Sequence, residues 1–230
     1  MDAIILAAGL GTRLRPYTLT TPKPLLPVRG RPILDWTLAA LPAGVERLVV
    51  VTHHLADQVE RYLRSQGHIP NWTTVHQQTP RGTGDAFRSC RGQVRADRVL
   101  VLNGDDLYSA GDLKALAEKP AGLLVRQVDE PRKFGIVFTR PDGTLERLVE
   151  KPDLDGPQMA NIGAYLFPRW ALDIELPLSA RGEYEITDAV SAVAAKQPFH
   201  AVPAKTWLPI GDEAAWRAAD QLDLDRLLVG

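Results

Sequence analysis

Short apolar runs that alternate with helix-like stretches before residue 130 constrain the fold of this chain more than any other feature. Apolar residues recur near the helical spacing in Ile33–Leu41 and Ala56–Ser65, which lie between the first of these runs. Strands that alternate with helices favour a parallel sheet covered on both faces. The runs that we expect to form buried strands are Ala3–Ala7, Arg47–Thr52, Thr73–His76, Arg98–Leu102 and Gly122–Val128.

A different pattern begins near residue 130 and predicts an antiparallel addition to this sheet. Further strands are expected at Gly135–Thr139, Leu145–Glu150 and Ile162–Phe167, and further helices at Ile186–Lys196 and Glu213–Val229. No repeat, low-complexity segment or long linker interrupts the chain. We therefore predict an α/β fold in one domain over residues 1–230, with a mixed, mainly parallel sheet flanked by helices.

Composition excludes several classes of function. The formal net charge is −1 with both signs interspersed, which argues against a broad nucleic-acid-binding surface. The single cysteine, Cys90, cannot form an internal disulfide and suits a reducing cytoplasm. Met1-Asp2 leads directly into a strand-like run, unlike a signal peptide, and no apolar run approaches the roughly 20 residues of a membrane helix. We expect a cytoplasmic protein that binds neither nucleic acid nor membranes.

The segment Leu6–Leu14 follows the first predicted strand and has the composition of a phosphate-binding loop. Gly9 and Gly11 let backbone N–H groups approach an anion, and Arg13 adds a planar cation that can hold phosphate oxygens in a bidentate way. A dinucleotide-binding turn would need glycine in place of Leu14, and a Walker A loop would need Gly-Lys-Ser/Thr, so neither motif is present. A tight strand-to-helix turn would use the same glycines equally well.

The continuation Pro16–Val28 favours phosphate binding over a simple turn. Prolines at 22, 24 and 27 stiffen an extended segment and hold Lys23 at a defined place. A lysine held in this way, close in sequence to a phosphate loop, predicts a second cation for a triphosphate or a sugar phosphate.

The stretch from Leu6 to Leu34 resembles the sugar-1-phosphate nucleotidyltransferases, which include glucose-1-phosphate thymidylyltransferases and N-acetylglucosamine-1-phosphate uridyltransferases. The resemblance extends over nearly the whole chain and implies a Rossmann-like fold of the nucleotide-diphospho-sugar transferase type. It implies a nucleotide-binding part at about residues 1–130 and a sugar-phosphate-binding part at about residues 131–230. The implied nucleotide-binding residues are Leu6, Ala7, Ala8, Gly9, Gly11, Thr12, Arg13, Gln77, Gly82, Thr83 and Asn103.

Gln77 and Gln78 precede a segment that opens a predicted helix. A glutamine amide both donates and accepts, so it can bind the imide edge of uracil or thymine. The resemblance selects Gln77 over Gln78 and places the backbone of Gly82 and Thr83 against the base or ribose. A turn with helix-capping polar residues would account for Thr83 and its neighbours, but not for the glutamine.

Asp105 and Asp106 end an apolar strand, at the edge where open α/β sheets bind ligands. Mg²⁺ prefers hard oxygen ligands and keeps several waters. The resemblance assigns a Mg²⁺ ion to Asp105 and makes Asp106 a neighbour rather than a ligand.

Three later blocks resemble the same family in order: Phe134-Gly135-Ile136-Val137, Glu150-Lys151-Pro152 and Asn161-Ile162-Gly163. The resemblance implies that Gly135, Glu150 and Asn161 contact the sugar, while Lys151 meets the sugar phosphate. The segment Arg181–Asp188 is similar too, and we expect an architectural role for it, with Thr187 near the site.

The block Trp207–Asp212 departs from the family pattern Trp-x-Asp-x-Gly, because Pro209 stands where the second metal-binding aspartate is expected. Proline cannot bind a metal through its side chain. Three interpretations stay open: Asp212 supplies the ligand, the ion rests on Asp105, phosphates and water, or activity is weakened or lost.

The resemblance implies Mg²⁺-dependent transfer of a nucleotidyl group to a sugar 1-phosphate, with UTP or dTTP favoured and with Arg13, Lys23 and Lys151 as the catalytic residues. Alternatives are a cytidylyl- or guanylyltransferase of the same fold and a non-catalytic regulatory subunit that binds nucleotide sugar. Many relatives append a left-handed β-helix, which we expect to be absent here. The sequence leaves the sugar and the question of a homo-oligomer open.

Overall fold

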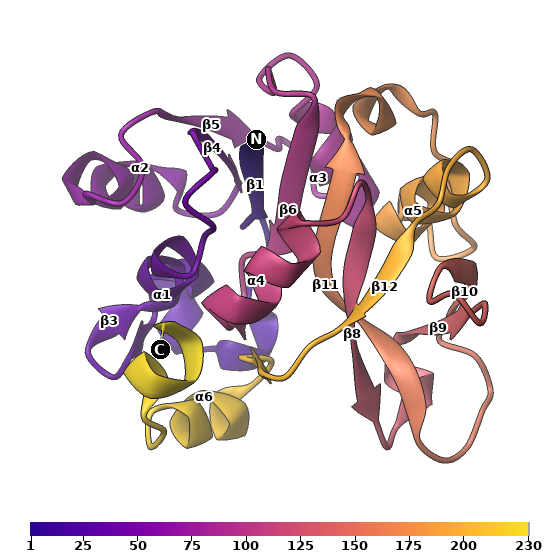
Figure 1. The fold of residues 1–230 in the computed structure, drawn as a ribbon. Helices are drawn as coiled ribbons and strands as arrows, with labels where there is room; N and C mark the ends of the chain where they lie inside the picture. The colour runs from indigo at the N-terminus through magenta and orange to yellow at the C-terminus, as the bar shows by residue number, and fades with distance from the viewer. Residues whose placement is uncertain (230) are drawn as a thin grey trace.

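The computed structural model describes residues 1–229 and contains a mixed sheet with helices on both faces (Figure 1). The strands of this sheet are β1 (Asp2–Leu6), β4 (Arg47–Thr52), β5 (Trp72–His76), β6 (Arg98–Asn103), β8 (Gly122–Val128), β9 (Gly135–Thr139), β10 (Leu145–Glu150), β11 (Gln158–Pro168) and β12 (His200–Pro203). The α-helices are α1 (Ile33–Ala39), α2 (Ala56–Ser65), α3 (Thr83–Ser89), α4 (Ala110–Ala117), α5 (Ile186–Ala194) and α6 (Glu213–Ala219). Two small ribbons pair β2 (Pro27–Val28) with β3 (Arg31–Pro32) and β7 (Asp106–Tyr108) with β13 (Trp207–Pro209).

The centre of the sheet is parallel and one side is antiparallel. β1 pairs in parallel with β4 and β6, and β5 pairs in parallel with β4. β11 runs antiparallel to β6 and carries β9 and β8 at different points along its length. The order β10-β9-β11-β6-β1-β4-β5, with β8 branching from β11 and β12 pairing with β8, confirms the predicted mixed sheet with an antiparallel addition.

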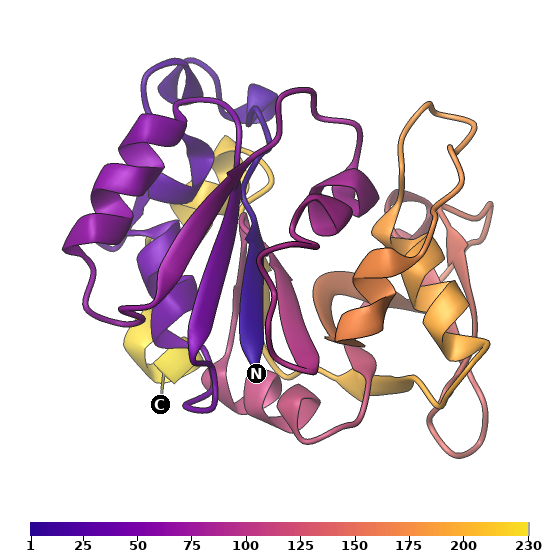
Figure 2. The ribbon, with the colours of Figure 1, turned by 90° about the horizontal axis from the view of Figure 1, so that it is seen from above.

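Alternate residues of β1 face two separate cores, as the two-residue period of a strand requires. Ala3 and Ile5 pack in a cluster that includes Leu63 of α2, whereas Ile4 packs in a cluster that includes Phe87 of α3. Figure 2 shows α1 and α2 on one side of the sheet and α3 and α5 on the other. Burial on both faces explains why the central strands are almost continuously apolar.

The carboxyl ends of the parallel strands meet along one edge. Leu6 is in register with Val51 of β4 and with Asn103 of β6. The backbone N–H of Gln77, just beyond β5, donates to the carbonyl of Thr52 at 2.8 Å. The segments after β1, β5 and β6 are thus brought together at the edge where open sheets of this kind bind ligands.

The prediction of one C-terminal helix over Glu213–Val229 is wrong. α6 ends at Ala219, and a separate π-helical turn covers Asp225–Val229. The Asp220 carboxylate accepts a hydrogen bond from the backbone N–H of Arg29, and the Asp223 carboxylate accepts one from Arg226. The Asp223 side chain binds the N–H three residues later, as an N-cap does, so a new helical segment begins here, separate from α6.

Several element bounds also differ from the sequence-based ones. β11 begins at Gln158 rather than at Ile162, and β7, β12 and β13 were not predicted. These short strands pair with partners that are distant in sequence, β7 with β13 and β12 with β8. Within residues 1–229, no helix combines the length and the apolar character that crossing a membrane requires.

Candidate functional site

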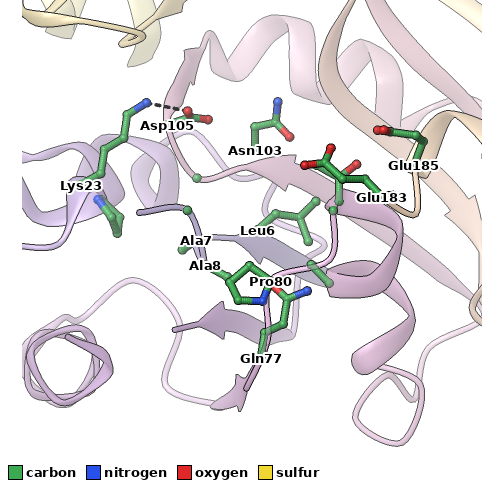
Figure 3. Close-up of a pocket in the computed structure, with 16 residues that line it drawn as sticks. Leu6, Ala7, Ala8, Lys23, Gln77, Pro80, Asn103, Asp105, Glu183 and Glu185 are labelled. Carbon is green, nitrogen blue, oxygen red and sulfur yellow. Dashed lines mark hydrogen bonds and ion pairs between the residues drawn. The ribbon is translucent and has the colours of Figure 1, made fainter. Parts of the chain in front are cut away.

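A cavity of about 390 Å³ opens at the carboxyl edge of β1. Figure 3 shows Lys23 and Asp105 on one side of it and Gln77 on the other, with the loop after β1 between them. Gly82, which precedes α3, has φ of +101°, and a Cβ there would lie 2.4 Å from the carbonyl oxygen of Tyr184, so only glycine fits. The predicted nucleotide-binding residues that line this cavity are Leu6, Ala7, Ala8, Gly9, Gln77, Gly82, Thr83 and Asn103.

A second cavity, of about 930 Å³, adjoins the first. The two share Thr83, Asn103, Asp105 and Glu185, so they form one cleft with two compartments. The predicted sugar-binding and metal-binding residues that line the larger cavity are Gly135, Glu150, Lys151, Asn161, Thr187, Asp105 and Asp212, and Arg13 and Pro209 lie there as well.

Lys23, which lines the smaller cavity, forms an ion pair with Asp105, which lines both cavities. Lys23 Nζ donates to Asp105 Oδ2 at 2.6 Å, and the side chains are 8% and 43% exposed. Pro22 and Pro24 flank the lysine, and Lys23–Leu25 form a short 3-10 helix, so the extended segment predicted from the prolines is wrong at this point although the lysine is held in place. A buried ammonium needs such a partner, and the half-exposed carboxylate keeps an oxygen available to a ligand.

Gly11 and Thr12, two predicted nucleotide contacts, are not among the described residues that line either cavity. Gly11 has φ of +60°, and a Cβ there would lie 2.8 Å from Thr18 Cγ2. Its carbonyl accepts a hydrogen bond from the Thr18 hydroxyl at 2.8 Å. Gly11 therefore shapes the loop that brings Arg13 to the larger cavity, and direct contact with nucleotide stays a prediction.

Asp106 is buried beside this ion pair. Its Oδ2 accepts hydrogen bonds from Asn103 Nδ2 and the Tyr108 hydroxyl, both at 3.2 Å. Burial, and after it repulsion from Asp105, raises the pKa of Asp106 well above its ordinary value. Protein groups thus hold one carboxylate oxygen of Asp106, and its role as a neighbour of the metal ligand stays a prediction.

Gln77 lies at the far end of the smaller cavity and is only 5% exposed. Its Nε2 donates to Asp85 Oδ2 at 2.7 Å, and Arg81 donates to Asp85 Oδ1 at 3.1 Å. Its backbone carbonyl lies 2.7 Å from His53 Nδ1. His53 thus has a structural contact, and the Gln77 side chain is held in place from α3.

Glu150 stands in the larger cavity against Gly135. A Cβ on Gly135 would lie 2.9 Å from Glu150 Oε2, so the absence of a side chain there makes room for the carboxylate. Burial, and after it repulsion from Glu185, raises the pKa of Glu150, while Arg181 at 3.5 Å opposes this effect. The carboxylate is placed to accept hydrogen bonds from hydroxyl groups.

Lys151 and Asn161 lie in the same cavity. Lys151 has φ of +45°, a left-handed conformation that is costly for a residue with a side chain and tends to occur at functional sites. Asn161 Nδ2 donates to the Tyr165 hydroxyl at 2.8 Å, and its Oδ1 accepts from the backbone N–H of Gly163 at 3.1 Å. Protein contacts therefore fix the amide of Asn161 before any ligand binds.

The predicted metal site rests on Asp105 and on the segment after β13. Pro209 is in register with Asp106, and Ile210 N–H donates to the carbonyl of Asp105 at 3.0 Å. The segment Trp207–Asp212, which differs from the family pattern, therefore does lie beside Asp105. Asp212 caps α6, where it accepts from Ala215 N–H at 2.9 Å. The described residues hold no group of three or more His, Cys, Asp or Glu side chains suited to a metal. Mg²⁺ commonly uses one or two carboxylates plus substrate phosphates, so this donor set fits it.

Sequence reasoning missed the acidic residues Glu183 and Glu185, which line the smaller cavity. Tyr184 between them donates its N–H to the Arg81 carbonyl and accepts from Gly84 N–H, both at 2.8 Å. This pairing joins the segment after residue 180 to the start of α3. The similarity of Arg181–Asp188 to the family block was the one sequence signal that could have placed these two residues at the site. The hydrogen bonds that bring them there join segments far apart in sequence, so no local pattern predicts them.

Comparisons with known proteins show what this chain is similar to. The family model described as nucleotidyl transferase matches residues 2–226. The bifunctional protein GlmU of Methanocaldococcus jannaschii is 32% identical over 192 residues, which cover 83% of this chain and 46% of that protein. Mannose-1-phosphate guanylyltransferase of Mycobacterium tuberculosis is 31% identical over 220 residues, or 92% of this chain and 61% of the relative.

A solved structure from Bacillus anthracis, assigned as a glucose-1-phosphate thymidylyltransferase and determined in complex with sucrose, superposes with a TM-score of 0.83. It is 27% identical, and the match covers 98% of this chain and 96% of that one. This chain spans about half the length of the curated GlmU relatives that it matches.

Proposed function

This chain belongs to the nucleotidyl transferase family, and we propose that it transfers a nucleotidyl group from UTP or dTTP to a sugar 1-phosphate with the help of Mg²⁺. The match confirms the resemblance to sugar-1-phosphate nucleotidyltransferases that the sequence motifs predict. The products are a nucleotide sugar and pyrophosphate.

One observation carries the proposal: two compartments, one with Gln77 and the other with Glu150 and Lys151, meet at Asp105. A nucleotide in the first compartment and a sugar phosphate in the second would present their phosphates to each other at this junction. The buried Lys23 ammonium lies at the same place, where phosphate charge would gather. Two substrates held in adjoining compartments react as if at very high local concentration.

In the proposed reaction, an oxygen of the sugar 1-phosphate attacks the α-phosphorus of the nucleotide. The bond between that phosphorus and the bridging oxygen of the pyrophosphate breaks, and the leaving group takes the electron pair. The sugar phosphate is already ionised, so no general base is needed. Lys151 would align the nucleophile, while Arg13 and Lys23 would offset charge on the phosphates, so positioning and electrostatics supply the catalysis.

Mg²⁺ belongs to the proposal because the donor set fits it. Asp105 would hold the ion together with nucleotide phosphates and water, and Asp212 lines the same cavity as a second candidate ligand. A bound Mg²⁺ would neutralise negative charge on the phosphate oxygens.

The choice of UTP or dTTP rests on Gln77, whose amide can pair with the imide edge of uracil or thymine. The guanylyltransferase from Mycobacterium tuberculosis among the relatives supports GTP as a second candidate. A regulatory subunit that binds nucleotide sugar without turnover is the alternative that Pro209 supports, because this residue offers no side-chain ligand to a metal.

The test is pyrophosphate release from a panel of sugar 1-phosphates crossed with UTP, dTTP, CTP and GTP, with and without Mg²⁺. We expect Mg²⁺-dependent turnover with one nucleotide and one sugar 1-phosphate. Absence of turnover over the whole panel, with nucleotide-sugar binding intact, would reject the enzymatic proposal in favour of the regulatory alternative.

A further inference from the structure

The side chain of Gln77 has only one orientation that its surroundings satisfy. Its amide faces Asp85 Oδ2 at 2.7 Å, and a carboxylate oxygen can accept a hydrogen bond but cannot donate one. The NH₂ group must therefore point to Asp85, whichever way the amide would turn on its own. Gln77 is 5% exposed and lines the smaller cavity, so it offers a ligand its carbonyl oxygen and the one remaining N–H.

Asp85 is itself held by a separate donor. Arg81 Nη2 donates to Asp85 Oδ1 at 3.1 Å, whereas Gln77 uses Oδ2. Each oxygen of the carboxylate thus has its own partner, and the Asp85 side chain is only 21% exposed. An amide in place of this carboxylate would keep a single acceptor, which the guanidinium of Arg81 would claim because it can only donate.

We propose that Asp85 is a positioning residue which, through Gln77, makes the site select against cytosine; this inference rests on the proposed function. In the fixed orientation, the Gln77 carbonyl oxygen meets N3–H of uracil or thymine, and the remaining N–H meets the adjacent base carbonyl. Cytosine has an acceptor at N3 and a donor at N4. It would pair only with a turned amide, whose carbonyl oxygen would then face the Asp85 carboxylate.

The size of this selection follows from the cost of a mispaired polar group. A buried acceptor placed against another acceptor loses its hydrogen bond, and such a loss corresponds to discrimination of about 10- to 100-fold. Guanine presents N1–H beside O6, the same donor–acceptor order as uracil. The Asp85–Gln77 pair therefore rejects cytosine in particular, and exclusion of purines has to come from the shape of the cavity.

The test is the variant Asp85→Asn, measured by equilibrium binding of UTP, dTTP and CTP and by kcat/KM for each nucleotide that turns over. Because Arg81 keeps the Oδ1 acceptor, the new Nδ2 faces Gln77 and turns its amide. We expect the preference for UTP or dTTP over CTP to fall by about 10- to 100-fold. Asp85→Glu, which keeps both acceptors, should retain most of the preference.

The matched control is Asp57→Asn, because Asp57 also pairs with an arginine four residues away, Arg61, and its side chain is 71% exposed. This variant should leave the preference unchanged. Asp85→Ala serves as a second variant if the Asp85→Asn protein does not fold. It should bring the ratio of affinities for UTP or dTTP over CTP towards one. In a protein that already carries Gln77→Leu, Asp85→Asn should cause no further change in the preference for UTP or dTTP over CTP.

An equal loss of affinity for all nucleotides in Asp85→Asn would overturn the inference, since that is the result of a purely structural role. A wild-type protein that binds CTP as tightly as UTP and dTTP would overturn it as well. Failure of turnover alone would reject the proposed function, whereas the binding preference decides the role of Asp85 independently.

Discussion

Lys23 Nζ lies 2.6 Å from Asp105 Oδ2, and this pair joins the proline-rich segment after β1 to the end of β6. The lysine is 8% exposed and the aspartate 43%, so the positive group is fixed while its partner faces the cleft. The two compartments of the cleft meet at Asp105. The pair therefore fixes a positive charge at the place where the proposed chemistry brings the phosphates together.

Replacing Lys23 with methionine should lower kcat by about 100- to 1,000-fold, because a fixed positive charge at the reacting phosphates is lost. The fold should persist, since methionine fills a similar volume and Asp105 remains partly solvated. Pyrophosphate release under saturating substrates measures the effect. Lys114→Met, on the exposed face of α4, is the control. A loss of less than tenfold in Lys23→Met would contradict the assigned role.

Gly135→Ala should raise KM for the sugar 1-phosphate by about 10- to 100-fold, since a misplaced contact is costly in an oriented site. The added Cβ would lie 2.9 Å from Glu150 Oε2 and would push the carboxylate away from its position. KM for the nucleotide should change little, because Gly135 lines only the larger cavity. Gly67→Ala is the matched control, because a Cβ there meets no atom within 4 Å. Equal changes in both KM values would argue against a sugar-binding role for Glu150.

Asp35 should make stability depend on pH in the acidic range. Burial raises the pKa of Asp35, but hydrogen bonds from Tyr62 and Arg31 outweigh it and lower the pKa below 3.8. A depressed folded-state pKa adds stability above the unfolded value, and that stability is lost as pH falls through the folded value. Asp35→Asn should therefore destabilise the protein at pH 7 and converge with the wild type only as pH falls through the folded-state pKa of Asp35, which lies below 3.8.

Urea unfolding of wild type and Asp35→Asn across this pH range measures the difference. Asp57→Asn, from the exposed Arg61–Asp57 pair, should show a much smaller difference because exposed ion pairs contribute little. The difference in free energy of unfolding between wild type and Asp35→Asn should shrink as pH falls. If it stays constant or grows, the ionised Asp35 carboxylate is not the group that makes stability depend on pH.

Leu228→Ala should destabilise the protein by about 2–5 kcal/mol, the usual range for removal of a buried leucine side chain. Leu228 is 1% exposed and packs in a cluster with Leu14, Trp36 and Ile210. Leu227, next to it, is 38% exposed, so Leu227→Ala should lower the free energy of unfolding much less. Denaturant unfolding compares the two variants. Similar stabilities would mean that the segment after α6 does not contribute to this core.

The sequence by itself determined the layered fold and, through its resemblance to a known family, many of the residues that line the cleft. Continuous apolar runs specify strands buried on both faces, as in Arg47–Thr52, because the backbone period and the need to bury side chains act locally. Prolines around Lys23 restrict the backbone directly, so the sequence also showed that this lysine is held in place. Turn and strand chemistry placed Gln77 and Asp105 at strand ends in the same way.

Only the tertiary structure decided how these pieces meet. The hydrogen bonds of Tyr184 to Arg81 and Gly84 bring the acidic residues Glu183 and Glu185 into the smaller cavity. Asp220, the residue after α6, accepts a hydrogen bond from the backbone N–H of Arg29, a contact between distant segments that no local pattern encodes. The ion pair of Lys23 with Asp105 and the hold of Asp85 on Gln77 are fixed by burial and by hydrogen-bond complementarity, which exist only once distant segments pack together.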